Sequence, residues 1–322
     1  MCGSQDKGNH VSFSIHTPLI ESLPLSNICG TRVFAKMDAL QPSGSFKMRG
    51  IGYAAQHYAT QGAKRLISSS GGNAGLAVAY AGRTLGLPVL VVVPETTPQR
   101  AIDLLQQEKA DVIVHGTSWV EANALAQSKR TETDAFFHPF DDPLLWEGHA
   151  SMIDEVVADG LRPDAVILSV GGGGLLAGVH HGLIRNGLNT TPILALETHG
   201  MASYHAALNA GGPVTLDAVS GVATSLGAKQ VCQQAYDIAQ THDIRSVLVS
   251  DKEAVDACFS FLSDHRILVE PACGSALAAI YAGYVDLRGL QNVTMIHRGG
   301  YKTPIETIKQ LRDSFDGPLC DY

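Results

Sequence analysis

The sequence AVILSVGGGGLLAGVH, residues 165–180, places a run of apolar residues directly before four glycines and a helix-like segment. A short, continuously apolar run is typical of a strand buried on both faces of a sheet. Glycines after such a strand allow a tight turn, and the helix that follows offers unpaired N–H groups to an anion. Residues 66–85 repeat this order, with Gly71 and Gly72 before a helical pattern over 73–85. The two segments predict two similar α/β units with a site between their loop ends.

Short apolar runs alternate with longer helix-like stretches along the chain. They occupy residues 66–67, 88–93, 112–114, 165–170, 193–196, 247–249 and 293–296. This alternation predicts mainly parallel strands joined by crossover helices, and therefore an α/β fold.

The periodicity breaks near residues 139–146, where Pro139 and Pro143 flank Phe-Asp-Asp. We place the seam between two domains there. We expect a smaller α/β domain at 41–143 and a larger, cofactor-binding α/β domain formed by 1–40 and 144–322. Each domain would be doubly wound, with the substrate cleft between them.

The composition argues against several classes of function. The 322 residues are 45% hydrophobic and carry a formal net charge of −8 without a block of like charges, so we expect no nucleic-acid or membrane partner. No apolar run is long enough to span a membrane, and residues 1–10 lack the apolar core of a signal peptide. We expect a cytoplasmic protein with a small soluble substrate. The six scattered cysteines predict reduced thiols.

A second informative stretch is SGSFKMRG, residues 43–50, which places Lys47 among serines and glycines. A lysine is a nucleophile toward an aldehyde only when enough of it is neutral, and burial lowers its pKa by penalising the charged form. Phe46 could cover one face of a planar ring. Taken alone, Lys47 fits better as a solvated lysine at a helix start, because most lysines are of this kind.

Two loops supply anion-binding groups. Gly171 to Gly174 lack the lysine of a nucleotide P-loop and the spacing of a dinucleotide fingerprint, but suit a phosphate held by backbone N–H groups. Residues 68–75, SSSGGNAG, suit a substrate carboxylate, and Asn73 can donate to a ring oxygen. A plain tight turn and an ordinary helix N-cap are the alternatives. With Lys47, these loops are the minimum needed to hold pyridoxal phosphate.

Together the motifs resemble the serine/threonine dehydratase family of fold-type II pyridoxal phosphate enzymes, most closely its serine dehydratase-like branch. The likeness covers nearly the whole chain, through residues 37–38, 41–52, 69–75, 140–143, 146–151, 169–177, 197–200 and 267–274. It implies the tryptophan synthase β-like fold, a homodimer, and a carbon–oxygen lyase reaction. In that reaction a β-hydroxy-α-amino acid of the serine or threonine type loses water and gives a 2-oxo acid and ammonia. The short segment after residue 296 leaves no room for a regulatory domain, so we expect no feedback inhibition.

The resemblance also implies a role for each residue of the site. Lys47 would be the Schiff-base lysine and proton-transfer base, Phe46 would stack on the ring, and Asn73 would bind its oxygen. The phosphate would be bound by Gly171, Gly172, Gly173, Gly174 and Leu175, and the substrate carboxylate by Ser70, Gly71 and Ala74. Glu197 and Ser203, with carbonyls near Gly171, Met201, Leu226 and Ala228, would surround a monovalent cation such as K⁺. Glu197 could instead simply cap or bridge loops.

One position departs from the family pattern. Where the family has Val-Cys-Gly-Gly-Ser-Asn, residues 296–302 are Ile-His-Arg-Gly-Gly-Tyr-Lys, which aligns Arg298 with the residue that faces the pyridine nitrogen. A guanidinium only donates, so a nitrogen bound to it carries no proton and the ring draws electrons less strongly. We therefore expect a β-carbon that tolerates positive charge, as in a β-aryl serine such as 3-phenylserine. Alternatively, Arg298 swings away and binds a carboxylate elsewhere.

Two other functions remain open. A racemase or epimerase needs an acid/base on the face opposite Lys47. In the related serine racemases a serine of the carboxylate loop serves this purpose, but that position matches Gly71, which has no side chain. A non-catalytic relative could keep the fold and bind a metabolite, although the presence of Lys47, Asn73 and the glycine loop in one chain favours catalysis.

Overall fold

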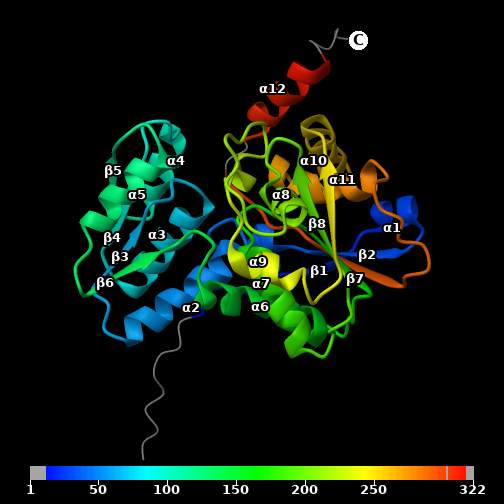
Figure 1. The fold of residues 1–322 in the computed structure, drawn as a ribbon, viewed down its shortest axis with the longest axis horizontal. Helices are drawn as coiled ribbons and strands as arrows, with labels where there is room; N and C mark the ends of the chain where they lie inside the picture. Colours follow the sequence, from blue (N-terminus) through cyan, green and yellow to red (C-terminus); the bar gives the residue numbers. More distant parts are fainter. Residues whose placement is uncertain (1–11, 302–303, 317–322) are drawn as a thin grey trace, which may run out of the picture.

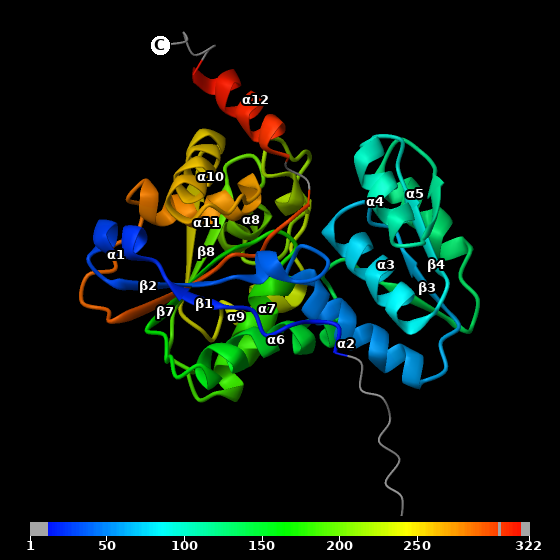
Figure 2. The ribbon, with the colours of Figure 1, turned by 180° about the vertical axis from the view of Figure 1, so that it is seen from behind.

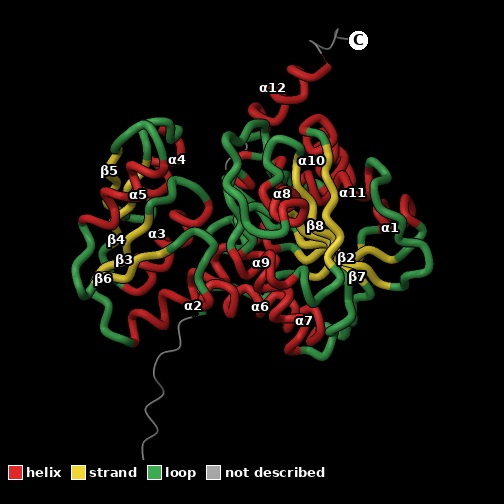
Figure 3. Tube along the Cα trace, in the orientation of Figure 1, coloured by secondary structure: helices red, strands yellow, loops and turns green. Residues whose placement is uncertain are grey.

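The computed structural model describes residues 12–301 and 304–316, which form two α/β halves side by side (Figure 1). Strands gather into two separate sheets, one in each half (Figure 3). The larger sheet has the order β1 (Leu19–Glu21), β2 (Arg32–Lys36), β10 (Asn292–Ile296), β7 (Ala165–Ser169), β8 (Ile193–Thr198) and β9 (Ile244–Val249). The smaller sheet has the order β5 (Asp111–Val114), β4 (Val89–Val93), β3 (Arg65–Ser68) and β6 (Asp134–Phe137).

The pairing within both sheets is parallel except between β1 and β2. This confirms the predicted α/β fold with mainly parallel sheets. Each of the seven apolar runs singled out in the sequence overlaps a strand. The structure adds β1, β2 and β6, which the sequence pattern did not reveal. The four-stranded sheet comes from residues 65–137, and the domain boundaries at 41 and 143 stay a prediction.

Helices connect and cover the strands. They are α1 (Leu23–Cys29), α2 (Lys47–Thr60), α3 (Asn73–Leu85), α4 (Gln99–Gln107), α5 (Trp119–Ser128), α6 (Pro143–Ala158), α7 (Gly174–Arg185), α8 (Ser203–Ala210), α9 (Gln233–Ile238), α10 (Asp251–His265), α11 (Pro271–Tyr281) and α12 (Ile305–Asp316), with short 3₁₀ helices η1 (Asp38–Leu40) and η2 (Thr224–Leu226). In the larger half, α10 and α11 lie on one side of the sheet and α6 and α7 on the other (Figures 1 and 2). The sequence prediction of a helix over 73–85 is confirmed by α3.

Local sequence signals explain several helix ends. Ser250 and Glu253 form a capping box at the start of α10. The Asp142 carboxylate accepts the N–H of Leu144 at the start of α6, where Pro143 has no N–H to satisfy. Gly86 ends α3 in the left-handed conformation, at φ 69°.

Two large apolar clusters form the core, and one of them joins the two halves. The first joins the smaller sheet and α2 to α6, α7 and one face of the larger sheet, so the halves share a core at their seam. The second fills the space between the other face of the larger sheet and α10 and α11. Among the described residues, Cys29, Cys232, Cys258 and Cys273 are free thiols, whereas Cys2 and Cys320 lie outside the described residues. In the described ranges, every helix is too short or too polar to cross a membrane.

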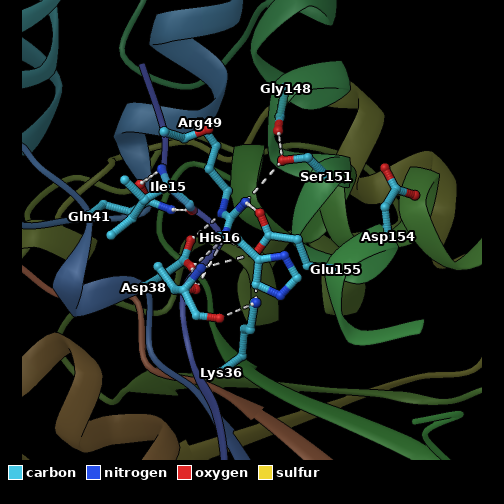
Figure 4. Close-up of polar contacts among 12 residues, drawn as sticks. Ile15, His16, Lys36, Asp38, Gln41, Arg49, Gly148, Ser151, Asp154 and Glu155 are labelled. Carbon is cyan, nitrogen blue, oxygen red and sulfur yellow. Dashed lines mark hydrogen bonds and ion pairs between the residues drawn. The ribbon is translucent and has the colours of Figure 1, made fainter. Parts of the chain in front are cut away.

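A buried ion network fixes the start of α2 to the larger half (Figure 4). Arg49 donates to Asp38 at 2.7 Å and to Glu155 of α6 at 2.6 Å, and the side chains of Arg49 and Asp38 are fully buried. Lys36 on β2 pairs with Glu155 at 2.6 Å and donates to the Thr17 carbonyl at 2.7 Å. Because Arg49 is on the first turn of α2, the network also sets the position of the residues that begin this helix.

We expect Arg49→Met to lower the free energy of unfolding by about 3–5 kcal/mol, because the Asp38 carboxylate would remain buried without its cation. Urea unfolding followed by circular dichroism measures this loss. The control is Arg288→Met, since Arg288 is 82% exposed in its ion pair with Asp286 and should cost about 0.5 kcal/mol or less. Equal costs for the two variants would show that the buried network does not stabilise the fold.

Candidate active site

Lys47 is the first residue of α2 and is half-buried. Its Nζ donates to the Pro139 carbonyl oxygen at 2.5 Å and lies 4.9 Å from the centre of the Phe46 ring. Burial, and secondarily the positive charge of Arg298, lower the pKa of Lys47 to about 7. A substantial fraction of the amine is therefore neutral near pH 7, which satisfies the requirement for a lysine that attacks an aldehyde.

The four glycines lie between β7 and α7, as the sequence predicts, and Leu175 is buried in the first turn of α7. A Cβ at Gly172 would lie 2.3 Å from a ring carbon of Phe140, and one at Gly174 would lie 2.6 Å from the Phe140 carbonyl oxygen. Gly173 has φ 95°. These positions leave no room for side chains, so the loop presents bare backbone at the N-terminus of a helix. Phe140 follows Pro139, and the two residues connect this loop to Lys47.

The serine- and glycine-rich loop links β3 to α3 and reaches the larger half through Asn73. The Ser70 hydroxyl oxygen accepts the N–H of Gly72 at 3.2 Å. Asn73 is buried, its Nδ2 donates to a Glu270 oxygen at 3.4 Å, and its Oδ1 accepts the N–H of Tyr301 at 3.1 Å. Residues 68–75 therefore face the end of β10 across the seam.

Arg298 lies at this meeting point, 4% exposed. Its carbonyl accepts the N–H of Phe46 at 2.9 Å, and its guanidinium carbon is 5.5 Å from the centre of the Phe46 ring. Its Nη2 lies 3.3 Å from the Ser225 hydroxyl and 3.7 Å from Glu270, whereas the buried Nε has no partner among the described residues. Burial lowers the pKa of Arg298, and the neighbouring carboxylate of Glu270 opposes this shift.

Glu197 and Ser203 meet the glycine loop on its other side. The Glu197 carboxylate is fully buried and accepts the N–H groups of Tyr204 at 2.9 Å and His205 at 2.8 Å, at the start of α8. The Ser203 hydroxyl lies 3.5 Å from the Gly171 carbonyl oxygen. Burial raises the pKa of Glu197 to about 7. The carboxylate thus caps a helix, and within the described ranges no group of three or more His, Cys, Asp or Glu residues is arranged to hold a metal.

The predicted site residues therefore lie in connected loops, and together they fit pyridoxal phosphate. A lysine with a lowered pKa suits an aldehyde, and a backbone loop without side chains suits a phosphate. An aromatic ring suits the flat ring of the cofactor, and an unpaired buried guanidinium N–H suits its ring nitrogen. Three contacts of the site were missed from the sequence: Ser225, Glu270 and Tyr301. Only Glu270 had a signal, since it lies in the run 267–274 that carries part of the family resemblance.

Two comparisons of sequence agree with this geometry. A family model described as pyridoxal-phosphate dependent enzyme matches residues 13–299. A Mus musculus protein named serine dehydratase-like is 50% identical over 307 residues, covering 92% of this chain and 93% of the relative. The Homo sapiens protein named L-serine dehydratase/L-threonine deaminase is 46% identical over 297 residues, covering 91% of this chain and 88% of the relative.

A solved structure supports the same assignment of fold. The fungal L-serine ammonia-lyase from Rhizomucor miehei superposes with a TM-score of 0.89 at 32% identity, covering 95% of this chain and 100% of that chain. The predicted fold-type II architecture is thereby confirmed.

The lowered pKa of Lys47 predicts how the apoprotein takes up pyridoxal phosphate. Because only the neutral amine attacks, the rate of uptake should rise with pH and level off above about pH 8, whereas an ordinary lysine with a pKa above 10 would give a rate still rising at pH 9. Stopped-flow recording of the visible absorbance measures the rate. Arg298→Met removes a neighbouring positive charge and should move the profile to higher pH. A wild-type rate that still rises tenfold per pH unit at pH 9 would contradict the shift.

Proposed function

The chain belongs to the family of pyridoxal-phosphate dependent enzymes, and on this basis we propose that it is an ammonia-lyase that removes water from a β-hydroxy-α-amino acid. The products are a 2-oxo acid and ammonia. The observation that carries this proposal is Lys47, a lysine with a pKa of about 7 in one site with a glycine loop and Asn73. The names of the mouse and human relatives and of the fungal structure support the class of reaction.

When bound, pyridoxal phosphate supplies an aldehyde that combines with the substrate amine and a conjugated ring that draws electrons from the α-carbon. Lys47 acts as the base at that carbon, because an amine with a pKa of about 7 accepts a proton near neutral pH. It can then return the proton to the leaving β-hydroxyl. The backbone N–H groups of 171–175 hold the phosphate, and Phe46 covers one face of the ring.

The substrate carboxylate is held at the N-terminus of α3 by Ser70, Gly71 and Ala74. Backbone N–H groups and the Ser70 hydroxyl are its donors there. Asn73 donates from Nδ2 to the ring oxygen, an orientation supported by the N–H of Tyr301 that already binds Oδ1.

Elimination is better supported than racemisation. A two-base racemase needs a proton donor on the face opposite Lys47, and the loop has a glycine where related racemases have a serine. A Cβ at Gly71 would lie 2.8 Å from Cγ2 of Thr97, so a side chain there would also need its neighbour to move. Release of ammonia from an amino acid, rather than inversion of its α-carbon, is the outcome that separates the two reactions.

Arg298 supports a finer proposal about the substrate. Its buried Nε–H has no partner among the described residues, and we propose that it donates to the pyridine nitrogen. A nitrogen in this state carries no proton of its own, so removal of the α-proton gains less from the ring. Loss of the β-hydroxyl must then run ahead of proton removal or together with it, which favours a β-aryl group that stabilises positive charge. The proposed substrate is a β-aryl serine, with 3-phenylserine as the test case.

We expect the wild-type holoenzyme to turn over 3-phenylserine with a kcat/KM about tenfold above that of serine or threonine. Arg298→Cys should change the visible spectrum of the bound cofactor and move the preference toward serine, because the ring nitrogen could then carry a proton. Ammonia release measures turnover, and Lys47→Ala, which should stay colourless, is the control. A strong wild-type preference for serine would refute the larger substrate, and an unchanged spectrum in Arg298→Cys would place Arg298 away from the ring.

We also propose that Glu197 and Ser203 take part in binding a monovalent cation such as K⁺. A buried carboxylate beside a hydroxyl and the Gly171 carbonyl offers the oxygen ligands that a hard cation prefers. The family resemblance further supports a homodimer.

Replacing K⁺ with tetramethylammonium should lower kcat about tenfold, because the cation would support the glycine loop at Gly171. Adding K⁺ back should restore kcat in the wild type but not in Glu197→Gln. Ammonia release in the two salts measures the effect. Equal rates in both salts would leave Glu197 as a helix-capping residue only.

A further inference from the structure

The side chain of Tyr301 has no role in the site described so far, yet this residue joins the two halves of the molecule. It follows Gly299 and Gly300 after β10 of the larger sheet. Its phenol hydroxyl donates to the Gly71 carbonyl oxygen, and its backbone N–H donates to Asn73 Oδ1 at 3.1 Å. Both acceptors belong to the proposed carboxylate loop of the smaller half. One residue therefore binds this loop at two points from across the seam.

The backbone contact determines the orientation of Asn73. An N–H group can only donate, so the oxygen of the Asn73 amide must face Tyr301. The amide nitrogen then faces Glu270, at 3.4 Å, and stays a donor toward the site. The approach of Tyr301 requires glycine before it, because a Cβ at Gly300 would lie 1.9 Å from the Glu270 carboxylate.

The phenol contact reaches Ser70 through a single peptide group. The Gly71 carbonyl and the Gly72 N–H belong to the same planar trans peptide and point in opposite directions. Because the carbonyl is held by Tyr301, the N–H is directed to the Ser70 hydroxyl oxygen, which accepts it at 3.2 Å. With its oxygen held in this way, the Ser70 hydroxyl proton has no acceptor among the described residues and is free to bind an anion.

The phenol is suited to this permanent contact. Burial raises the pKa of Tyr301, so the hydroxyl keeps its proton and remains a donor over the working pH range. The half-buried ring packs against the core cluster that spans the seam.

We propose that Tyr301 is a positioning residue that holds the carboxylate loop in its binding shape and, through Gly71 and Gly72, directs the Ser70 hydroxyl at the substrate carboxylate. The proposal rests on the proposed function only in assigning the carboxylate to this loop. It deepens that function by naming the residue that sets affinity for the carboxylate.

The test uses holoenzyme of Tyr301→Phe, which removes one hydroxyl but keeps the ring and the backbone N–H that binds Asn73. Glycine and methylamine, which differ by the carboxylate, are the probes, and the change in visible absorbance gives each Kd. We expect the Kd of glycine and the KM of the substrate to rise about five- to tenfold, with less than about a twofold change for methylamine. The kcat and the cofactor spectrum should not change. Tyr284→Phe is the matched control, because Tyr284 is exposed and its hydroxyl binds Glu253, away from this loop.

A double variant tests the route through the serine. If Tyr301 acts by orienting the Ser70 hydroxyl, Tyr301→Phe should weaken glycine binding much less in a Ser70→Ala background than in the wild type. Equal effects in both backgrounds would overturn that route. Unchanged glycine affinity in Tyr301→Phe, or equal losses for glycine and methylamine, would overturn the proposal as a whole.

The titration needs no turnover, so its failure differs from failure of the proposed function. If glycine affinity falls in Tyr301→Phe but no β-hydroxy amino acid yields ammonia, the positioning role stands and the elimination reaction is wrong. If ammonia is released and glycine affinity is unchanged, the reaction stands and Tyr301 has no part in holding the carboxylate.

Discussion

The ion pairs of Arg49 hold the first turn of α2 against η1 and α6, and the location of Lys47, the proposed catalytic lysine, depends on this contact. A first helical turn has few backbone hydrogen bonds of its own and frays unless something holds it. Here the Arg49 guanidinium lies between two carboxylates, with Lys36 alongside, and these charged hydrogen bonds fix the geometry of the turn. Lys47 lies two residues earlier, so its amine is placed from a rigid base and not from a mobile loop.

The candidate active site holds positive and negative charges close together. Burial and the guanidinium of Arg298 both disfavour the charged form of Lys47, which is why its pKa lies near neutrality. Arg298 is itself buried, and burying its charge without a partner would destabilise the fold. Glu270, at 3.7 Å, supplies the opposite charge. Ser225 donates to Glu270 and accepts from Arg298, and so connects the pair. The carboxylate thus lets a buried arginine act on the lysine without destabilising the fold.

The elements that carry strong local patterns could be predicted from the sequence, and those set by distant partners could not. Seven apolar strand segments and the helix over 73–85 were found because periodicity and flanking glycines are local. β2 was missed because it ends in Lys36, whose buried charge is paired with Glu155, over a hundred residues later in the chain. Tyr301 was missed for the same reason, since its partner Gly71 is 230 residues away and nothing near either residue signals the contact.

The two bonds from Tyr301 to the serine- and glycine-rich loop have a thermodynamic consequence. Glycines are the residues with the most backbone freedom, so an unrestrained segment of this kind would lose much conformational entropy on closing around a small ligand. A loop that is already ordered before the ligand binds loses most of this conformational entropy during folding. The affinity then depends mainly on the contacts with the ligand. Preorganisation of this kind allows a loop to bind a molecule of only a few atoms, although the contact area between them is small.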